Sequence, residues 1–331
     1  MELARLKKLK LSPRPIGQRL FADTILRTGF TNPFRPTKIQ IENFDRLPKS
    51  TGSFIVMNHT DRYTCWPFQY YLHREHRRYT STWVKAKYYQ NPAMAWILDR
   101  FNNIPIPSLG YLIVKDFERA TGHPPSPTEY EILKRFADGT TDEESLQKQL
   151  ILDRSKTSHG LMLTLGSGRN PGAEHWRKSV RDRFDELMSE VVRLNREALA
   201  TGLDIMIFPE GTRHKRLGQG FTGAAQMILA TGATVVPIGA SGIDRLFPGG
   251  SPFSRGGTAK FRIGTPLRPG HELKHFEDGP AFVPFTPDAR LQEHRFRGLT
   301  ELMMDRINEL LDPEYQRVAD GVAKTGASRF I

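Results

Sequence analysis

The residues of this sequence that could do chemistry lie in two short polar runs. The first run, Asn58-His59-Thr60-Asp61-Arg62, places a histidine that exchanges protons near neutral pH two residues before a carboxylate. The second, Pro209-Glu210-Gly211-Thr212-Arg213, ends in a guanidinium suited to binding a phosphate, and His214, Lys215 and Arg216 follow it. Glu210 could form an ion pair with Arg213 or accept from a substrate hydroxyl. For either run alone, a structural histidine or a solvated ion pair is the more common explanation.

Apolar strands must position both runs. Ser53 to Met57 and Leu203 to Phe208 are almost wholly apolar, which is typical of strands buried on both faces of a parallel sheet. In open α/β sheets the carboxyl ends of such strands bind ligands. We expect further strands at 83–87, 234–238 and 259–263, and helices at 66–72, 180–202, 221–230 and 291–311. This alternation predicts an α/β fold with a mostly parallel central sheet flanked by helices.

Taken together, the two runs resemble motifs of the glycerolipid acyltransferases, the family of the lysophosphatidate and glycerol-3-phosphate acyltransferases. The first motif of that family is Asn-His-x4-Asp and the third is Phe-Pro-Glu-Gly-Thr-Arg, which stands here at residues 208–213. Residues 86–106, with Lys87, Trp96 and an Ile-Pro-Ile run, are similar to the second motif, and residues 235–238 are similar to the fourth. The four blocks cover most of residues 53–245, and the third is highly specific.

The sequence departs from the family pattern at three places. Thr64 stands where the family has the aspartate of its first motif, so Asp61 is the nearest carboxylate that could hold the imidazole. Pro107 and Ser108 replace the Asp-Arg pair after Ile-Pro-Ile, and Arg177 or Arg181 could supply the missing arginine. The resemblance lapses over residues 108–176, and we expect this insertion to form a helical lid or cap over the substrate channel.

The resemblance implies an O-acyltransferase of phospholipid biosynthesis. Such an enzyme moves a fatty acyl group from a thioester of coenzyme A or acyl carrier protein to the hydroxyl of a lysophospholipid or glycerol phosphate. In this hypothesis His59 is the general base and Asp61 holds its tautomer. Lys87 or backbone N–H groups stabilise the oxyanion. The acceptor phosphate is bound by Glu210, Gly211, Thr212 and Arg213. The thioester is a co-substrate, and no cofactor or metal is required.

Charge and composition restrict the class of partner. The 331 residues carry a formal charge of +12, which favours a phosphate-bearing substrate, an anionic membrane surface or nucleic acid. Nucleic acid is the least favoured of the three because the basic residues are spread along the chain. A catalytically silent lipid-binding or acyl-carrier-binding member of the fold is the main alternative, suggested by Thr64 and Pro107. The single cysteine, Cys65, excludes an intramolecular disulfide.

The sequence divides into three parts. Residues 1–30 form a basic amphipathic N-terminal arm, residues 31–312 the acyltransferase domain with its insertion, and residues 313–331 a tail that we expect to fray. The leucines of the arm, among them Leu6, Leu9 and Leu11, serve equally well for contact with a bilayer surface or for packing on the domain. No apolar run reaches the length of a spanning helix and no signal peptide is evident. We therefore expect a cytoplasmic protein, peripheral on the inner face of the cell membrane.

Overall fold

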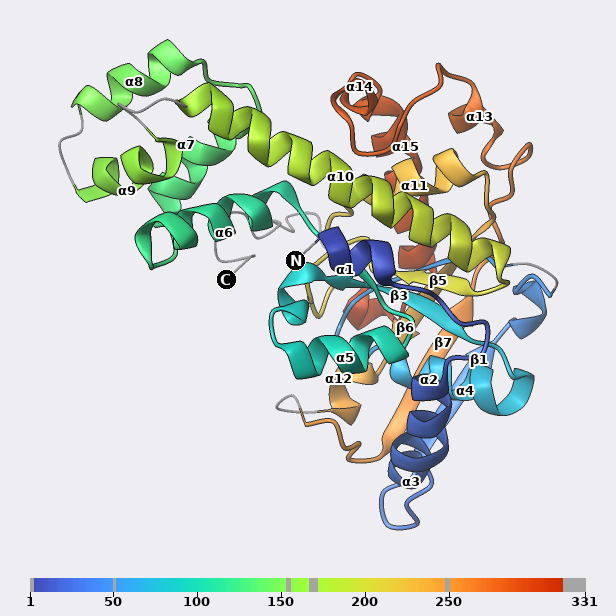
Figure 1. Cartoon of the computed structure of the whole chain (residues 1–331). Helices are drawn as coiled ribbons and strands as arrows, with labels where there is room; N and C mark the ends of the chain where they lie inside the picture. Colours follow the sequence, from blue (N-terminus) through green and yellow to red (C-terminus); the bar gives the residue numbers. More distant parts are fainter. Residues whose placement is uncertain (1–2, 50–51, 153–155, 167–171, 248–250, 318–331) are drawn as a thin grey trace.

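The computed structural model describes residues 3–49, 52–152, 156–166, 172–247 and 251–317 (Figure 1). Within them, the centre is a seven-stranded sheet in the order β1-β7-β6-β2-β5-β3-β4. The strands are β1 Thr37–Glu42, β2 Phe54–Met57, β3 Thr80–Lys85, β4 Ile104–Ile106, β5 Asp204–Ile207, β6 Val235–Ser241 and β7 Gly257–Ile263. Neighbouring strands are parallel except β6 and β7. The predicted α/β fold with a mostly parallel sheet is therefore confirmed.

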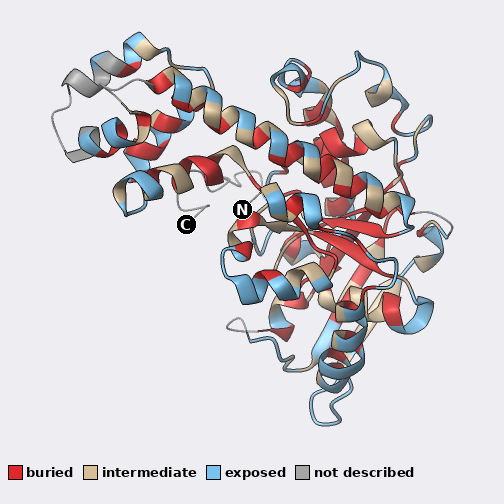
Figure 2. Ribbon diagram, in the orientation of Figure 1, coloured by how far each residue is buried: buried red, intermediate tan, exposed pale blue. Residues whose placement is uncertain are grey.

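The sheet separates two apolar layers, and β2 shows how the sequence builds both. All four of its residues are buried, and because side chains alternate along a strand, Phe54 and Val56 pack into one layer while Ile55 and Met57 pack into the other. The first layer is covered by α10 Ala173–Ala200, α11 Gly223–Thr231 and α15 Glu293–Glu309. The second is covered by α3 Arg27–Phe30, α4 Trp66–His76 and α12 Ile243–Leu246. Figure 2 shows the buried sheet between these helices.

The insertion forms a helical lobe beside the sheet. It contains α6 Leu109–Thr121, α7 Pro127–Ala137, α8 Glu143–Leu152 and α9 Lys156–Leu165, and the first turns of α10 complete it (Figure 1). Ser126 and Glu129 form a capping box that starts α7, and Phe117, Leu133 and Phe136 are fully buried between the helices. The predicted helical insertion is confirmed, and its role as a lid stays a prediction.

The leucines of the N-terminal arm pack on the domain. In and just after α1 Leu3–Lys8, the side chains of Leu6, Leu9 and Leu11 are buried in the same layer as α10. The Arg193 guanidinium of α10 donates to the backbone carbonyl of Leu6 at 3.0 Å. Of the two alternatives left open by the sequence, packing on the domain is the one observed for these leucines. In the part of the chain that the structure describes, no helix is long and apolar enough to cross a bilayer.

The shorter elements fill the edges of the fold. They are α2 Ile16–Phe21, the π turn η1 Ala22–Leu26, η2 Phe44–Arg46, η3 Ala86–Tyr89, α5 Pro92–Arg100, α13 Lys274–Glu277, α14 Pro287–Arg290 and η5 Pro313–Tyr315. The strand expected at 83–87 ends at Lys85, so Lys87 lies in the 3₁₀ turn η3 and not at a strand end. Residues 318–331 of the predicted tail lie outside the described residues.

Candidate active site

His59 is held by three segments that are distant in the sequence. Its neighbour Asn58, at the end of β2, uses its amide to pair with both backbone groups of Ala240 in β6, at 2.9 and 2.8 Å. The His59 N–H donates to Glu210 Oε2 at 2.8 Å, and the His214 N–H donates to the His59 carbonyl at 2.9 Å. The two predicted runs therefore meet at one edge of the sheet, and hydrogen bonds lock the backbone of His59 between them.

Glu210 is the centre of this arrangement. Its carboxylate is 1% exposed, and its second oxygen accepts the Gly218 N–H at 2.8 Å. Burial raises the pKa of Glu210 to about 7, although the two N–H groups and the charge of Arg317 act in the opposite direction. The sequence assigned Glu210 to substrate binding. The structure instead turns its carboxylate inward onto backbone donors, which makes it a residue that positions His59.

The imidazole of His59 is neutral near pH 7. Its ring stacks on Phe208, with centroids 4.2 Å apart and planes at 20°. Burial lowers the pKa of His59 to about 3, and the cations Arg213 and Lys85 lower it further, as does His214. A neutral imidazole is the form that accepts a proton, so the ring is in the protonation state that a base requires.

Asp61 does not hold the imidazole, which corrects the pairing expected from the sequence. His59 Nδ1 is buried and has no hydrogen-bond partner among the described residues. The Asp61 carboxylate instead accepts the Tyr63 N–H at 2.8 Å, and the Asp61 N–H donates to Thr64 Oγ1 at 2.9 Å. Aspartate and threonine commonly form such local turns with the backbone two or three residues on. Thr64, at the position of the family aspartate, thus serves the turn that leads into α4.

The remaining residues of the second run are Gly211, Thr212 and Arg213, of which Arg213 adds a positive charge that acts on His59. Gly211 has φ of 61°, a left-handed conformation that favours glycine, and it turns the chain after Glu210. Thr212 Oγ1 lies 3.3 Å from the Glu210 carbonyl. Arg213 is exposed, and its charge lowers the pKa of both His59 and Asp61. This run therefore contains an exposed arginine whose charge acts on the histidine.

The lysine and arginine candidates of the second motif are distributed differently from the expectation. The resemblance pointed to Lys87, but Lys85, the last residue of β3, is the lysine whose charge lowers the pKa of His59. Arg177 and Arg181, suggested as substitutes for the missing arginine, lie in the helical lobe. Arg177 pairs with Glu174, and Arg181 pairs with Asp138 at 3.0 Å. The structure therefore does not bring either arginine to the site.

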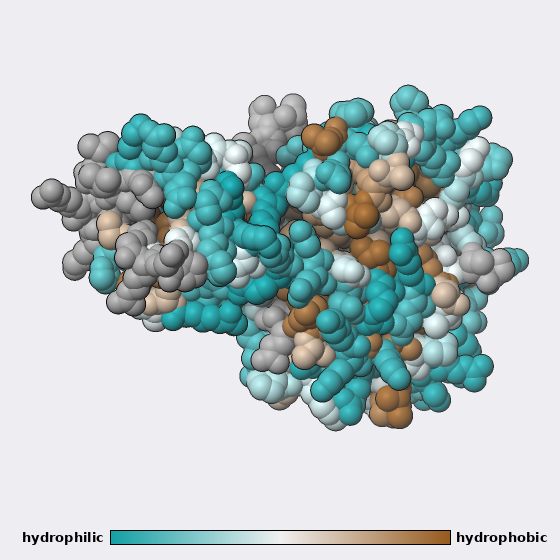
Figure 3. Space-filling view, turned by 45° about the horizontal axis from the view of Figure 1, so that its top comes forward, coloured by the Kyte–Doolittle hydropathy of each residue, from teal (hydrophilic) through white to brown (hydrophobic). Residues whose placement is uncertain are grey.

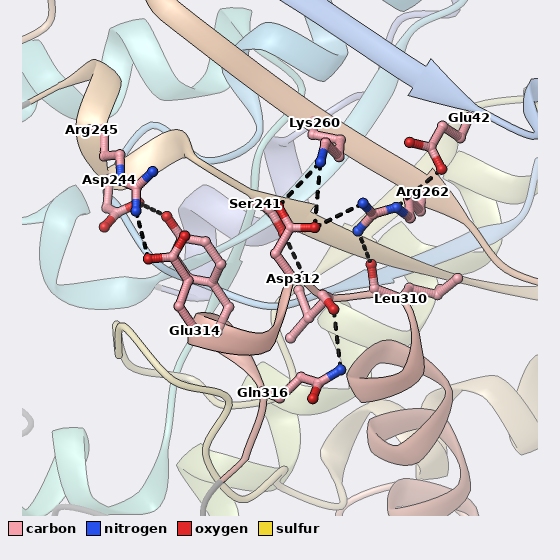
Figure 4. A network of polar contacts seen from close by, with 12 residues as sticks. Glu42, Ser241, Asp244, Arg245, Lys260, Arg262, Leu310, Asp312, Glu314 and Gln316 are labelled. Carbon is pink, nitrogen blue, oxygen red and sulfur yellow. Dashed lines mark hydrogen bonds and ion pairs between the residues drawn. The ribbon is translucent and has the colours of Figure 1, made fainter.

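A C-terminal strap, residues 310–317, fastens the second run from outside. Figure 4 shows Asp312 between Lys260 and Arg262 of β7, at 3.3 and 2.8 Å. The Tyr315 hydroxyl donates to the Asp244 carboxylate at 2.7 Å, and the backbone carbonyl of Tyr315 accepts the Leu217 N–H at 2.8 Å. Tyr315 is 1% exposed. The expected fraying therefore does not apply to residues 313–317.

Sequence reasoning missed several residues of this site. Asn58 was quoted as part of a motif without a role, although a polar residue at the end of an apolar strand is a signal for one. The sequence of the strap carries no comparable signal. The charge of Arg317 acts on Glu210 only because the fold brings these two distant residues near each other. The Arg317 guanidinium forms ion pairs with Glu301 and Asp305 of α15, at 3.2 and 3.3 Å.

Fold and site together define an α/β protein in which the runs that contain His59 and Arg213 follow the carboxyl ends of two neighbouring parallel strands, β2 and β5. A protein-family model described as Acyltransferase matches residues 168–241, which include the whole second run and β6. This match agrees with the resemblance to an acyltransferase over these residues and supports acyl transfer as the class of reaction. The first run, with His59, lies outside the matched residues.

Two further comparisons accompany this match. Among solved structures, the chain is similar to the 1-acyl-sn-glycerophosphate (LPA) acyltransferase PlsC from Thermotoga maritima, with a TM-score of 0.38 and 14% identity over 92% of this chain and 78% of that one. A superposition with this TM-score supports no inference about substrate or residues. No curated protein matches the chain significantly.

Proposed function

We propose that this protein transfers a fatty acyl group from a thioester of coenzyme A or acyl carrier protein to the hydroxyl of a lysophospholipid or glycerol phosphate in phospholipid biosynthesis. The proposal rests on one observation: the backbone N–H of His59, whose imidazole is neutral, donates to the carboxylate of Glu210 in the Phe-Pro-Glu-Gly-Thr-Arg run. A hydroxyl is a weak nucleophile until a base removes its proton during attack, and a buried, neutral imidazole can accept that proton.

In the proposed reaction the acceptor oxygen attacks the thioester carbonyl while its proton moves to His59. The carbonyl electrons form an oxyanion, which Lys85, Lys87 or backbone N–H groups stabilise. When the intermediate collapses, the carbon–sulfur bond breaks and the departing thiolate takes the proton from the imidazolium. The products are the acyl ester and the free thiol. The steps need no metal or cofactor beyond the thioester itself.

Arg213 would bind the phosphate of the acceptor. Its guanidinium can form two parallel hydrogen bonds with phosphate oxygens, and the neighbouring Gly211 and Thr212 offer backbone and hydroxyl donors. This set lies beside His59, so a bound phosphate would place the acceptor hydroxyl within reach of the base. Glu210, predicted to bind substrate as well, would act by holding this loop against His59.

One observation favours the catalytically silent alternative. Because His59 Nδ1 has no partner, no carboxylate stabilises an imidazolium, and the pKa near 3 makes the ring a weak base. A chain that uses the same site only to bind lipid or acyl carrier would have these properties as well.

The test is release of free thiol from palmitoyl-coenzyme A by the purified protein, with and without lysophosphatidate. Release that depends on the acceptor and is lost in His59→Ala supports the proposal, with the exposed His271→Ala as a matched control that should behave like the wild type. The assay is repeated with acyl carrier protein thioesters and a panel of lysolipids. Absence of thiol release with every donor and acceptor, while lysolipid still binds, would support the silent alternative.

A further inference from the structure

Helix α5 exposes apolar side chains where a surface helix normally exposes polar ones. Met94, Trp96 and Ile97 are 45, 56 and 41% exposed, whereas Ala95 is its one buried residue. The Asn91 side chain caps the helix by accepting the N–H groups of residues 93 and 94, at 2.9 and 3.1 Å. The outward apolar side chains therefore belong to a well-formed helix and are not a frayed end.

Helix α2 continues this apolar surface. Ile16 and Leu20 are 61 and 60% exposed, and Ile25 in the turn that follows is 43% exposed. The two helices touch through their backbones, since a Cβ atom on Gly17 would lie 2.5 Å from the Arg100 carbonyl oxygen. Figure 1 shows α2, α3 and α5 on the same lower side of the molecule. We call this surface the α2/α5 face, made of Ile16, Leu20, Ile25, Met94, Trp96 and Ile97.

The charge around the α2/α5 face is positive. The exposed cations in its segments are Arg14, Arg19, Arg27 and Arg100. Residues 12–30 and 92–100 contain two carboxylates, Asp23 and Asp99, and each is engaged in an ion pair, with His73 and Arg5 respectively. The Arg100 guanidinium lies over the Trp96 ring, 3.5 Å from its centroid. Indole and aliphatic groups ringed by arginines match the boundary between acyl chains and anionic headgroups.

Apolar side chains are also exposed elsewhere on the described surface, among them Phe34 and Phe253, at 92 and 63%. Figure 3, which brings the top of the molecule toward the reader, shows brown and tan residues next to one another among hydrophilic ones over the sheet domain. Val283 and Leu291, on either side of α14 in the sequence, are 62 and 82% exposed. Helix α14 lies at the upper end of the molecule in Figure 1. Val283 and Leu291 provide apolar side chains of comparable exposure away from the α2/α5 face.

The α2/α5 face lies next to the candidate active site. Phe21 of α2 packs edge-on against Trp66, with centroids 4.8 Å apart, and Trp66 lies 3.9 Å from the Tyr63 ring in the loop that follows His59. On the other side, α5 begins three residues after the turn η3, which follows Lys85. A partner on the α2/α5 face is therefore one layer of side chains away from the His59 loop.

We propose that the α2/α5 face docks the protein on a bilayer surface rich in anionic lipid, with Trp96 at the level of the headgroups. The choice of a bilayer as partner rests on the proposed function, in which the substrates are lipids. The leucines of α1 do not make this contact, because they are buried against α10. Docking by α2 and α5 would hold the His59 loop beside the surface where a lysophospholipid lies.

Co-sedimentation with vesicles tests the proposal without any substrate. Wild-type protein should bind phosphatidylcholine vesicles that contain phosphatidylglycerol and bind pure phosphatidylcholine vesicles more weakly. The variant Ile16→Ser/Leu20→Ser/Trp96→Ser should bind the anionic vesicles at least about tenfold more weakly, since each replacement removes several CH₂ or ring groups from the bilayer. The matched variant Val283→Ser/Leu291→Ser should bind like the wild type. Equal binding by wild type and the triple variant, or equal loss in both variants, would overturn the proposal.

Fluorescence provides a second readout that does not depend on a destabilising change. Brominated acyl chains should quench the emission of bound wild-type protein, and Trp96→Phe should bind as well but lose most of that quenching. Unchanged quenching in Trp96→Phe would contradict the placement of Trp96. A dimer in sedimentation velocity that the triple variant abolishes would assign the face to a second copy of the chain and overturn the bilayer. Because these measurements use no substrate, a negative result in the thiol assay would refute the proposed function and leave the docking result standing.

Discussion

Replacing Glu210 with glutamine should make the folded protein more stable at alkaline pH and less active. The folded-state pKa of Glu210 is about 7 and its ordinary value is 4.5. Below about pH 4.5 the carboxyl is protonated in both the folded and the unfolded chain. Between 4.5 and 7 the unfolded chain loses the proton first, so the free energy of unfolding falls as pH rises. Above about 7 the loss is complete.

The size of this loss follows from the pKa difference. A difference of 2.5 units at 1.36 kcal/mol each corresponds to about 3 kcal/mol. The group is 1% exposed, so solvent screening does not reduce this figure appreciably. Glutamine has, like the protonated acid, one acceptor and one donor, so Glu210→Gln should resemble the wild type near pH 4.5. Near pH 8 it should be more stable by about 3 kcal/mol.

Urea denaturation followed by circular dichroism at pH 4.5, 6 and 8 measures this difference. With a slope of about 3 kcal/mol per molar urea, the midpoints of the two proteins should separate by about 1 M at pH 8. Glu144→Gln is the control, because that carboxylate lies on the surface in an exposed pair with Lys148. Parallel curves for wild type and Glu210→Gln across the whole range would refute a raised pKa at Glu210.

Activity should change in the opposite direction. Each oxygen of the Glu210 carboxylate accepts one backbone N–H, from His59 or from Gly218. In glutamine an NH₂ group replaces one of these oxygens, so one of the two N–H groups faces a donor. The loss of that hydrogen bond, which protonated Glu210 shares at low pH, releases the His59 backbone, so kcat should fall by about ten- to a hundredfold with little change in KM. A variant with wild-type kcat would show that Glu210 does not position the base.

Three further changes test other parts of the structure. Asp61→Asn keeps an oxygen that can accept the Tyr63 N–H, so kcat should stay within about threefold of the wild-type value. A loss near the roughly 10⁴-fold that follows neutralisation of a triad aspartate would show that Asp61 contacts His59 during catalysis. Lys85→Met should raise the pKa of His59 in an NMR titration by up to about one unit, and Lys87→Met should leave that pKa unchanged. A shift in Lys87→Met and none in Lys85→Met would show that Lys87 is the lysine that acts on His59. Gly239→Ala places a Cβ 2.6 Å from the Cβ of Leu310 in the strap and should lower the free energy of unfolding by about 1–3 kcal/mol. The control Gly29→Ala, which has open space around it, should be neutral or stabilising. Equal denaturation midpoints for the two variants would contradict the packing of the strap on β6.

Local patterns in the sequence were sufficient for much of the fold. The run at 53–57 is apolar without interruption because β2 lies between two strands and under two helix layers, and a residue buried on both faces has no alternative to an apolar side chain. The same holds for β5 and β6. The long helix α10 is indicated in the sequence by apolar residues at three- and four-residue spacing. By contrast, β1 is an edge strand with partly exposed residues, and its sequence carries no such signal.

The types of residue at the site were also evident from the sequence, because strand ends in a parallel sheet collect polar side chains at one edge. His59, Glu210 and Arg213 meet there as expected. What each does depends on hydrogen bonds to groups far away in the chain. Whether Glu210 faces substrate or the His59 backbone is decided by the fold of the loop 208–218, and no spacing rule contains that information.

The sequence by itself therefore determined the central buried strands β2, β5 and β6, the long helix α10, and the sheet edge at which His59 lies, since these follow from periodicity and residue type. Only the tertiary structure decided that Asp61 serves its own turn, that the charge of Lys85 acts on His59, and that the leucines of α1 are covered while the apolar side chains of α2 and α5 are not. The physical reason is that an amphipathic helix or a polar loop can satisfy its groups in several ways. For the leucines of α1 the partners come from α10, far away in the sequence, whereas Asp61 is satisfied by backbone and side-chain groups two and three residues on.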